Sequence, residues 1–74
     1  MSEQQEELTR LTVNLIPKAD AALELAARVT GLSRTDTVNR ALQFYAYMMA
    51  VKDNGGEVLI RERKDGKLQR LVLR

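Results

Sequence analysis

The sequence predicts a small, mainly α-helical protein with a short N-terminal strand before the helices and a β-hairpin after them. Three observations support this fold class. Residues 10–15 alternate polar and apolar side chains, residues 17–51 repeat apolar side chains at helical spacing, and Asp65-Gly66 separates two short runs of strand-forming residues. A period of two is typical of a half-buried strand, and a period near 3.6 is typical of an amphipathic helix. The chain accordingly divides into a flexible acidic arm, a strand with two helices, a turn or linker, and a hairpin, at residues 1–8, 9–52, 53–56 and 57–74.

The size of the chain makes stability a problem for a single copy. It has 74 residues and contains neither cysteine nor histidine. A chain of this length buries only about 60% of the surface that its unfolded form exposes. Because disulfides and a structural zinc site are ruled out, association with a second copy is the remaining common source of stability.

The same composition argues against catalysis. Without histidine and cysteine, the usual general bases, thiol nucleophiles and zinc ligands are missing. Gly55-Gly56 lacks the continuation of a phosphate-binding loop. We therefore expect no enzyme activity, no cofactor and no metal site.

Charge is distributed unevenly. The formal net charge is +2, but residues 1–7 carry three acids and no base, whereas residues 57–74 carry six bases against three acids. The body of the protein is therefore cationic and suits an anionic partner. No apolar run approaches the length of a membrane span, and the N-terminus is acidic where a signal peptide is basic, so we expect a cytoplasmic protein that does not contact membranes.

The strand expected at residues 10–15 has two different sides. One side carries Leu11, Val13 and Leu15, and the other carries Arg10, Thr12 and Asn14. Helical residues follow at once, so the strand has no neighbour in sequence to complete its hydrogen bonds. By itself the polar side is either the solvated face of an ordinary strand or a binding surface.

The first helix is expected to begin at Pro17 and to end at Gly31. Proline suits the first helical turn, and glycine tolerates the positive φ at a helix C-terminus. Small apolar residues at helical spacing form a stripe that another helix can approach: Ala19, Ala22, Leu25, Ala26 and Val29.

The second helix is expected to follow the N-cap residue Ser33. It carries apolar residues on two sides, with Val38, Ala41, Leu42, Tyr45, Met48 and Met49 on one side and Phe44, Tyr47 and Val51 on the other. In so small a chain, a single monomer cannot bury both apolar sides of this helix. We expect a second copy of the chain to cover the remainder.

The C-terminal residues predict a hairpin with a two-residue Asp65-Gly66 turn. That turn pairs Ile60 with Leu71 and Val58 with Leu73, which places an apolar face near the open end and basic residues at the tip. An isolated hairpin is marginal in water, so the apolar face is expected to dock on the helices or to extend a sheet. The basic tip is either a solvated, charge-protected edge or a second contact to DNA.

The order strand, helix, glycine turn and helix resembles the ribbon-helix-helix family of transcriptional regulators, which includes the methionine and Arc repressors. The resemblance covers residues 9 to about 51. It rests on TRLTVNLIP, on AALELAARVTGLSRTDTVNRAL, and above all on GLSR at residues 31–34, which matches the family's pattern of glycine, hydrophobic, Ser/Thr and basic residues. The last eighteen residues lie outside the common core of the family.

The resemblance implies an obligate homodimer in which the two strands pair antiparallel as a ribbon. Such a ribbon fits the major groove of double-stranded DNA, where Arg10, Thr12 and Asn14 of each chain would face base edges. Arginine can bind guanine, asparagine can bind adenine, and threonine can contact thymine. The resemblance thus implies a sequence-specific regulator, a repressor in a prokaryote, plasmid or phage, whose dimers bind neighbouring half-sites side by side.

The start of the second helix is the expected phosphate contact. The free N–H groups near Ser33, Arg34 and Thr35, together with the positive end of the helix dipole, form an anion site. The Arg34 side chain would strengthen this site. Lys18, just after the ribbon, is a further candidate for contact with the DNA backbone.

Two alternative hypotheses are also consistent with the sequence. In the first, the chain is an antitoxin or accessory interaction module whose C-terminal hairpin engages a partner protein. In the second, the hairpin captures the N-terminal strand within one chain and produces a monomeric sheet.

Overall fold

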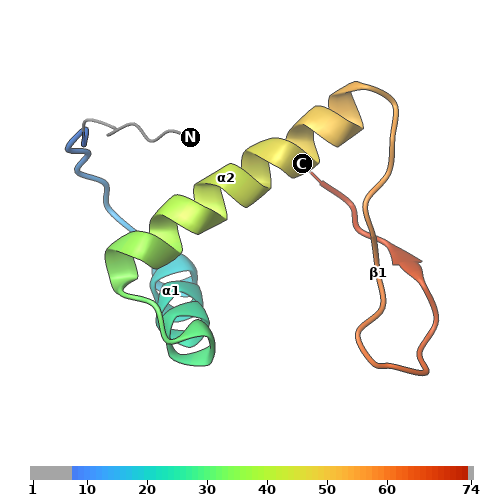
Figure 1. Ribbon diagram of the computed structural model, residues 1–74, viewed down its shortest axis with the longest axis horizontal. Coiled ribbons are helices and arrows are strands. Elements are labelled where there is room, and N and C mark those ends of the chain that lie inside the picture. The colour runs from blue at the N-terminus through green and yellow to red at the C-terminus, as the bar shows by residue number, and fades with distance from the viewer. Residues whose placement is uncertain (1–7, 74) are drawn as a thin grey trace, which may run out of the picture.

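The computed structural model describes residues 8–73 and consists of two helices followed by a small antiparallel sheet (Figure 1). The elements in chain order are α1 (Pro17–Thr30), α2 (Arg34–Asp53), β1 (Leu59–Ile60) and β2 (Gln69–Arg70). The mainly helical class and the C-terminal hairpin are therefore confirmed. The flexible arm predicted for residues 1–8 lies, except for Leu8, outside the described residues.

Helix α1 begins and ends where the sequence predicts. Ile16 precedes it with an extended backbone, and Pro17 occupies the first turn. Gly31 follows the last helical residue with φ of 76°, and its N–H donates to the Ala27 carbonyl at 2.8 Å. Only a residue without a β-carbon adopts this left-handed conformation without strain, which explains why the helix stops there.

Ser33 is the N-cap of α2, as predicted. Its hydroxyl oxygen accepts from the Asp36 N–H at 3.0 Å. The Thr37 hydroxyl donates to the Ser33 carbonyl at 2.7 Å, and the Thr37 N–H donates to the same carbonyl at 2.9 Å. Thr37 is buried, with 6% of its surface exposed. This network holds the corner between the two helices.

The face of α1 that packs on α2 differs in part from the predicted stripe. The half-buried side chains of α1 are Ala19, Leu23, Ala26 and Ala27. Leu25 and Val29 are exposed, at 52% and 74% of their surface. Helix α1 has two overlapping apolar stripes that share Ala19 and Ala26, and α2 covers the one that contains Leu23. The stripe with Leu25 and Val29 lacks cover within the described chain.

Helix α2 leaves both of its apolar sides largely open. It extends to Asp53, and only Met48, Met49 and Val51 join Thr37 in being at least half-buried. Leu42 on one side and Phe44 on the other are 56% and 62% exposed. No described hydrophobic side chain is fully buried. The described residues of one chain therefore leave apolar faces of both helices uncovered and form no hydrophobic core.

The hairpin register differs by two residues from the predicted one. Leu59 pairs with Arg70 and Ile60 with Gln69, and the Leu71 N–H donates to the Val58 carbonyl at 2.8 Å.

The expected two-residue Asp65-Gly66 turn is wrong because Gly66 closes a different turn. The Gly66 N–H donates to the Arg63 carbonyl at 2.9 Å, and Gly66 is not among the glycines with positive φ that a two-residue Asp-Gly turn requires. Residues 61–68 consequently form a longer loop. A shift of two residues preserves which side chains share a face, so Val58 and Leu71 remain together and half-buried.

The hairpin stands apart from the helix pair. No Cα atom of β1 or β2 lies within 8 Å of a helical Cα atom. The hairpin contacts α2 through its connection, where the Gly56 N–H donates to the Val51 carbonyl at 2.9 Å. The backbones of the strands thus do not lie against the helices in the single chain, and the side chains of the hairpin base face the end of α2 across a hollow lined by Lys52, Val58 and Leu71.

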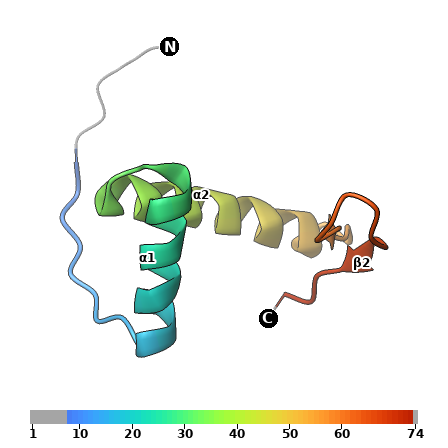
Figure 2. The ribbon, with the colours of Figure 1, turned by 90° about the horizontal axis from the view of Figure 1, so that it is seen from below.

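Residues 8–16 and the hairpin lie at opposite ends of the molecule in both ribbon views (Figures 1 and 2). The sheet of the described residues contains β1 and β2 alone. This arrangement contradicts the hypothesis that the hairpin captures the N-terminal strand within one chain.

The single chain is more open than a folded monomer of its size. Its radius of gyration is 15.2 Å, where about 11 Å is usual for 74 residues. Its accessible surface is 7077 Å², against roughly 4,600 Å² for a compact protein of 8.4 kDa. About 2,500 Å² of surface is thus exposed beyond what such a protein usually leaves open.

Candidate nucleic-acid interface

The three predicted base-reading residues lie in an exposed segment that leads into α1. Arg10, Thr12 and Asn14 are exposed, and residues 8–16 belong to no helix or strand of the described chain. Within the described residues, the backbone groups of 8–15 pair with no other segment. The segment therefore offers its backbone and its polar side chains to a partner.

The apolar side of the same segment is also open. Leu11, Val13 and Leu15 are 73%, 58% and 43% exposed, so coverage increases toward α1. Burying a leucine or valine side chain is worth about 1.5–3 kcal/mol, and this free energy is not gained in the single chain. Both requirements of an alternating strand, namely paired backbone groups and a covered apolar face, are therefore unmet.

The N-terminus of α2 presents backbone donors. Because Ser33 caps the Asp36 N–H and the Thr37 N–H is also bonded, the unpaired amides among the described residues here are those of Ser33, Arg34 and Thr35. Unpaired amides at the positive end of a helix dipole favour an anion. The structure thus brings together the backbone groups of the three residues predicted to bind phosphate.

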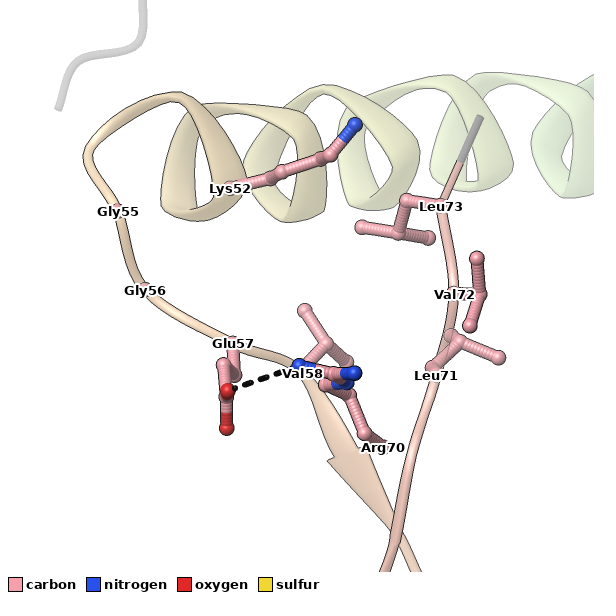
Figure 3. A pocket seen from close by; sticks show the side chains of 9 residues that line it. All are labelled: Lys52, Gly55, Gly56, Glu57, Val58, Arg70, Leu71, Val72 and Leu73. Atoms are coloured by element: carbon pink, nitrogen blue, oxygen red, sulfur yellow. Dashed lines mark hydrogen bonds and ion pairs between the residues drawn. The ribbon is translucent and has the colours of Figure 1, made fainter.

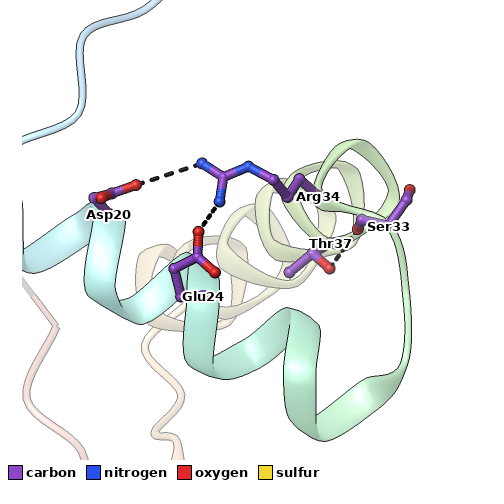
Figure 4. Close-up of polar contacts among 5 residues, drawn as sticks. All are labelled: Asp20, Glu24, Ser33, Arg34 and Thr37. Carbon is purple, nitrogen blue, oxygen red and sulfur yellow. Dashed lines mark hydrogen bonds and ion pairs between the residues drawn. The ribbon is translucent and has the colours of Figure 1, made fainter.

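The Arg34 side chain is bound within the chain by two carboxylates of α1 (Figure 4). Its Nη1 pairs with Glu24 Oε2, and its Nη2 lies 3.4 Å from Asp20 Oδ1. These two acids are not among the site residues predicted from the sequence. The available signal was their spacing of four residues, which places both on one face of α1.

Lys18 is exposed in the first turn of α1, directly after the base-reading segment. It shares this end of the molecule with residues 8–16. The structure does not group it with Arg34, whose contacts lie on Asp20 and Glu24.

A hollow lies between the end of α2 and the base of the hairpin (Figure 3), with a volume of about 340 Å³. Its lining includes Lys52, Val58 and Leu71, and at its edge Arg70 Nη1 lies 3.3 Å from Glu57 Oε2. Arg70, one of the predicted basic residues of the hairpin, is thus paired with an acid of the same chain. The remaining bases of the loop are exposed, namely Arg61, Arg63, Lys64 and Lys67.

Neither a metal site nor a membrane-spanning helix is present in residues 8–73. No group of three or more acidic, cysteine or histidine side chains there is placed to hold a metal ion. Neither α1 nor α2 has an apolar stretch of the length needed to cross a bilayer.

Comparison with protein-family models, with curated proteins and with solved structures finds no match to this chain. The ribbon-helix-helix resemblance of residues 9–51 therefore stays a prediction, which rests on the strand, the helix ends and the GLSR turn.

Proposed function

We propose that the protein is a homodimeric, sequence-specific DNA-binding regulator of the ribbon-helix-helix type, acting as a transcriptional repressor in a prokaryotic cytoplasm. The observation that carries this proposal is the exposed, unpaired segment at residues 8–16, with apolar side chains on one side and Arg10, Thr12 and Asn14 on the other. A twin segment from a second copy satisfies its backbone, and a shared core covers its apolar side.

The amount of exposed surface supports a dimer. Obligate interfaces bury about 2,000–5,000 Å² in total, or roughly 1,000–2,500 Å² for each partner. The surplus of about 2,500 Å² in the single chain lies at the upper end of this range. The uncovered faces of α1 and α2, including Leu25 and Leu42, are the expected helical part of the interface.

The polar side of the joint ribbon supplies the proposed recognition surface. Six side chains, three from each chain, would face the major groove, which admits a two-stranded ribbon. Arg10 and Asn14 each can form two hydrogen bonds to one base, and a good contact of this kind contributes about 1–3 kcal/mol of discrimination. Several such contacts are enough to define an operator.

The α2 N-terminus would fix the position of the dimer on the duplex. The unpaired amides of Ser33, Arg34 and Thr35 suit a phosphate oxygen, and the Arg34 and Lys18 side chains add positive charge. Dimers bound side by side on neighbouring half-sites are the expected higher assembly.

Selection of bound duplexes from a random pool tests this function directly. At a stated salt concentration near 0.15 M, we expect enrichment of a short motif that is symmetric or repeated in tandem. Retention of duplex without enrichment of any motif would rule out sequence-specific recognition, and no retention at any salt concentration would rule out DNA binding.

A second candidate function is an antitoxin or accessory protein-interaction module that binds a partner protein through the hairpin. It is favoured by the separation of β1 and β2 from the helices and by the exposure of Leu59, Leu68 and Val72 at 50%, 53% and 64%. Exposed apolar side chains beside basic ones suit an amphipathic acidic segment of another protein. Truncation before residue 57 tests whether the hairpin acts separately from DNA binding.

A further inference from the structure

The ion pairs of Arg34 join the first residue of α2 to the side of α1. Asp20 and Glu24 are four residues apart, so they lie on one face of α1 and reach the same guanidinium group (Figure 4). Arg34 Nη1 contacts Glu24 and Nη2 contacts Asp20. Both outer nitrogens of the guanidinium group are thus directed at carboxylates of the same chain.

This arrangement changes the charge next to the proposed phosphate site. Two carboxylates and one guanidinium give the cluster a net charge of −1, beside the unpaired amides of Arg34 and Thr35. A phosphate that approaches these amides meets an arginine whose two outer nitrogens already have anionic partners. The carboxylates and the phosphate therefore compete for the two outer nitrogens of the Arg34 guanidinium group.

A DNA phosphate can displace the two carboxylates from Arg34 because the ion pairs are exposed to solvent. The side chains of Arg34, Asp20 and Glu24 are 53%, 56% and 60% exposed. Exposed ion pairs contribute little to stability, whereas an arginine that binds phosphate through two parallel hydrogen bonds forms one of the stronger contacts in proteins. The guanidinium group can rotate from the carboxylates to a phosphate without the loss of a buried contact.

We propose that Asp20 and Glu24 are positioning residues that hold Arg34 beside the α2 N-terminus and that are displaced from it by a DNA phosphate. This inference rests on the proposed DNA-binding function and adds a mechanism that limits the affinity for DNA. The two acids lower the affinity that comes from the phosphate backbone, and with it the binding to duplexes of any sequence. In a dimer this effect operates twice, once at each α2 N-terminus.

The test replaces both acids by their neutral amides, Asp20→Asn with Glu24→Gln, in the full chain. Affinity for a duplex of random sequence is measured at fixed salt by fluorescence anisotropy. We expect binding to become about 3- to 30-fold tighter, because four exposed ion pairs in the dimer no longer compete with phosphate. A matched control, Glu62→Gln with Asp65→Asn, removes the same charge from the hairpin loop and should change affinity less than about 2-fold.

A double-mutant cycle shows whether the acids act through Arg34. In an Arg34→Gln background the same replacement of Asp20 and Glu24 should change affinity less than about 2-fold. An equal gain in that background would show a general effect of charge and would overturn the inference. Unchanged or weaker binding of the double variant in the native background would overturn it as well, because the acids would then only support the fold.

Folding and function are monitored separately. If helical circular dichroism shows that the double variant does not fold, Glu24→Gln alone replaces it, with an expected gain of about 2- to 5-fold. A native chain that binds no duplex overturns both the proposed function and this inference. A native chain that binds duplex while the acid variants bind no more tightly overturns the inference alone.

Discussion

At the scale of single residues, Arg10 and Asn14 are the side chains on which site preference is expected to depend. Both are exposed in a segment that lies outside α1 and α2. Arg10→Ala and Asn14→Ala should each reduce the preference for the selected duplex over a scrambled one by about 5- to 150-fold, which corresponds to one bidentate contact.

The measurement is a competition between selected and scrambled duplexes, with the dimer mass determined in parallel. Gln69→Ala, an exposed polar substitution at the other end of the molecule, is the control and should retain the preference. If both Arg10→Ala and Asn14→Ala retain it as well, the assignment of base-reading residues is wrong.

Arg34 is expected to act on affinity and not on sequence preference. Arg34→Ala should weaken binding to all duplexes and reduce the slope of log K against log salt by about 2, because the dimer loses two phosphate contacts.

The salt dependence is measured on selected and scrambled duplexes over a range of salt concentrations. Arg63→Ala makes the same change of charge in the hairpin loop and should leave the slope unchanged. A slope that is insensitive to Arg34→Ala would exclude this side chain from the phosphate contact.

Gly31 is expected to matter for stability because of its backbone conformation. At φ of 76° a β-carbon causes strain even though no atom lies within 4 Å of its position. Gly31→Ala should lower the free energy of unfolding by about 1 kcal/mol for each chain, and Gly31→Asn by less, since asparagine tolerates this region better. Urea unfolding of the three proteins checks the order, and equal stability of Gly31→Ala and the native chain would contradict it.

At the scale of elements, local signals predicted the ends of the helices well. Pro17, Gly31 and Ser33 act through their own backbone or through atoms three or four residues away, so the sequence contains what is needed. The packing face of α1 was less predictable. Two stripes share Ala19 and Ala26, and the choice between them depends on where α2 lies, which periodicity alone does not specify.

For the hairpin, too, features that depend on local sequence were predictable and features that depend on more distant contacts were not. Its existence and its shared apolar face were predictable from Asp65-Gly66 and from alternation. Its register was not, because the Arg63 to Gly66 turn replaced the two-residue turn and the ladder between β1 and β2 is only two pairs long. So short a ladder leaves the register to the turn and to neighbouring contacts such as the Glu57–Arg70 ion pair.

The separation of the hairpin from the helices yields a prediction at this scale. Deletion of residues 57–74 should leave a folded dimer that binds the selected duplex with less than about a 5-fold change in affinity, because no Cα atom of β1 or β2 lies within 8 Å of a helical Cα atom. Circular dichroism, mass in solution and anisotropy together check this result. Unfolding of the truncated chain would instead place the hairpin in the core of the dimer, and retained binding would favour a separate partner for the hairpin.

At the scale of the whole molecule, the missing hydrophobic core is the feature that the rest of the account depends on. The sequence is 45% hydrophobic, yet no hydrophobic side chain among residues 8–73 is fully buried. Patterning predicted this situation, because α2 has two apolar sides and the N-terminal strand has no neighbour. The arrangement of the faces that two copies would bury depends on contacts between chains, which neither the pattern nor a single chain contains.

The most direct measurement is the mass of the protein in solution by sedimentation equilibrium, combined with helical circular dichroism across a dilution series. We expect a folded species of twice 8.4 kDa, whose helicity is lost as dilution dissociates it. A helical species of 8.4 kDa that stays folded on dilution would contradict the claim that two copies complete one fold.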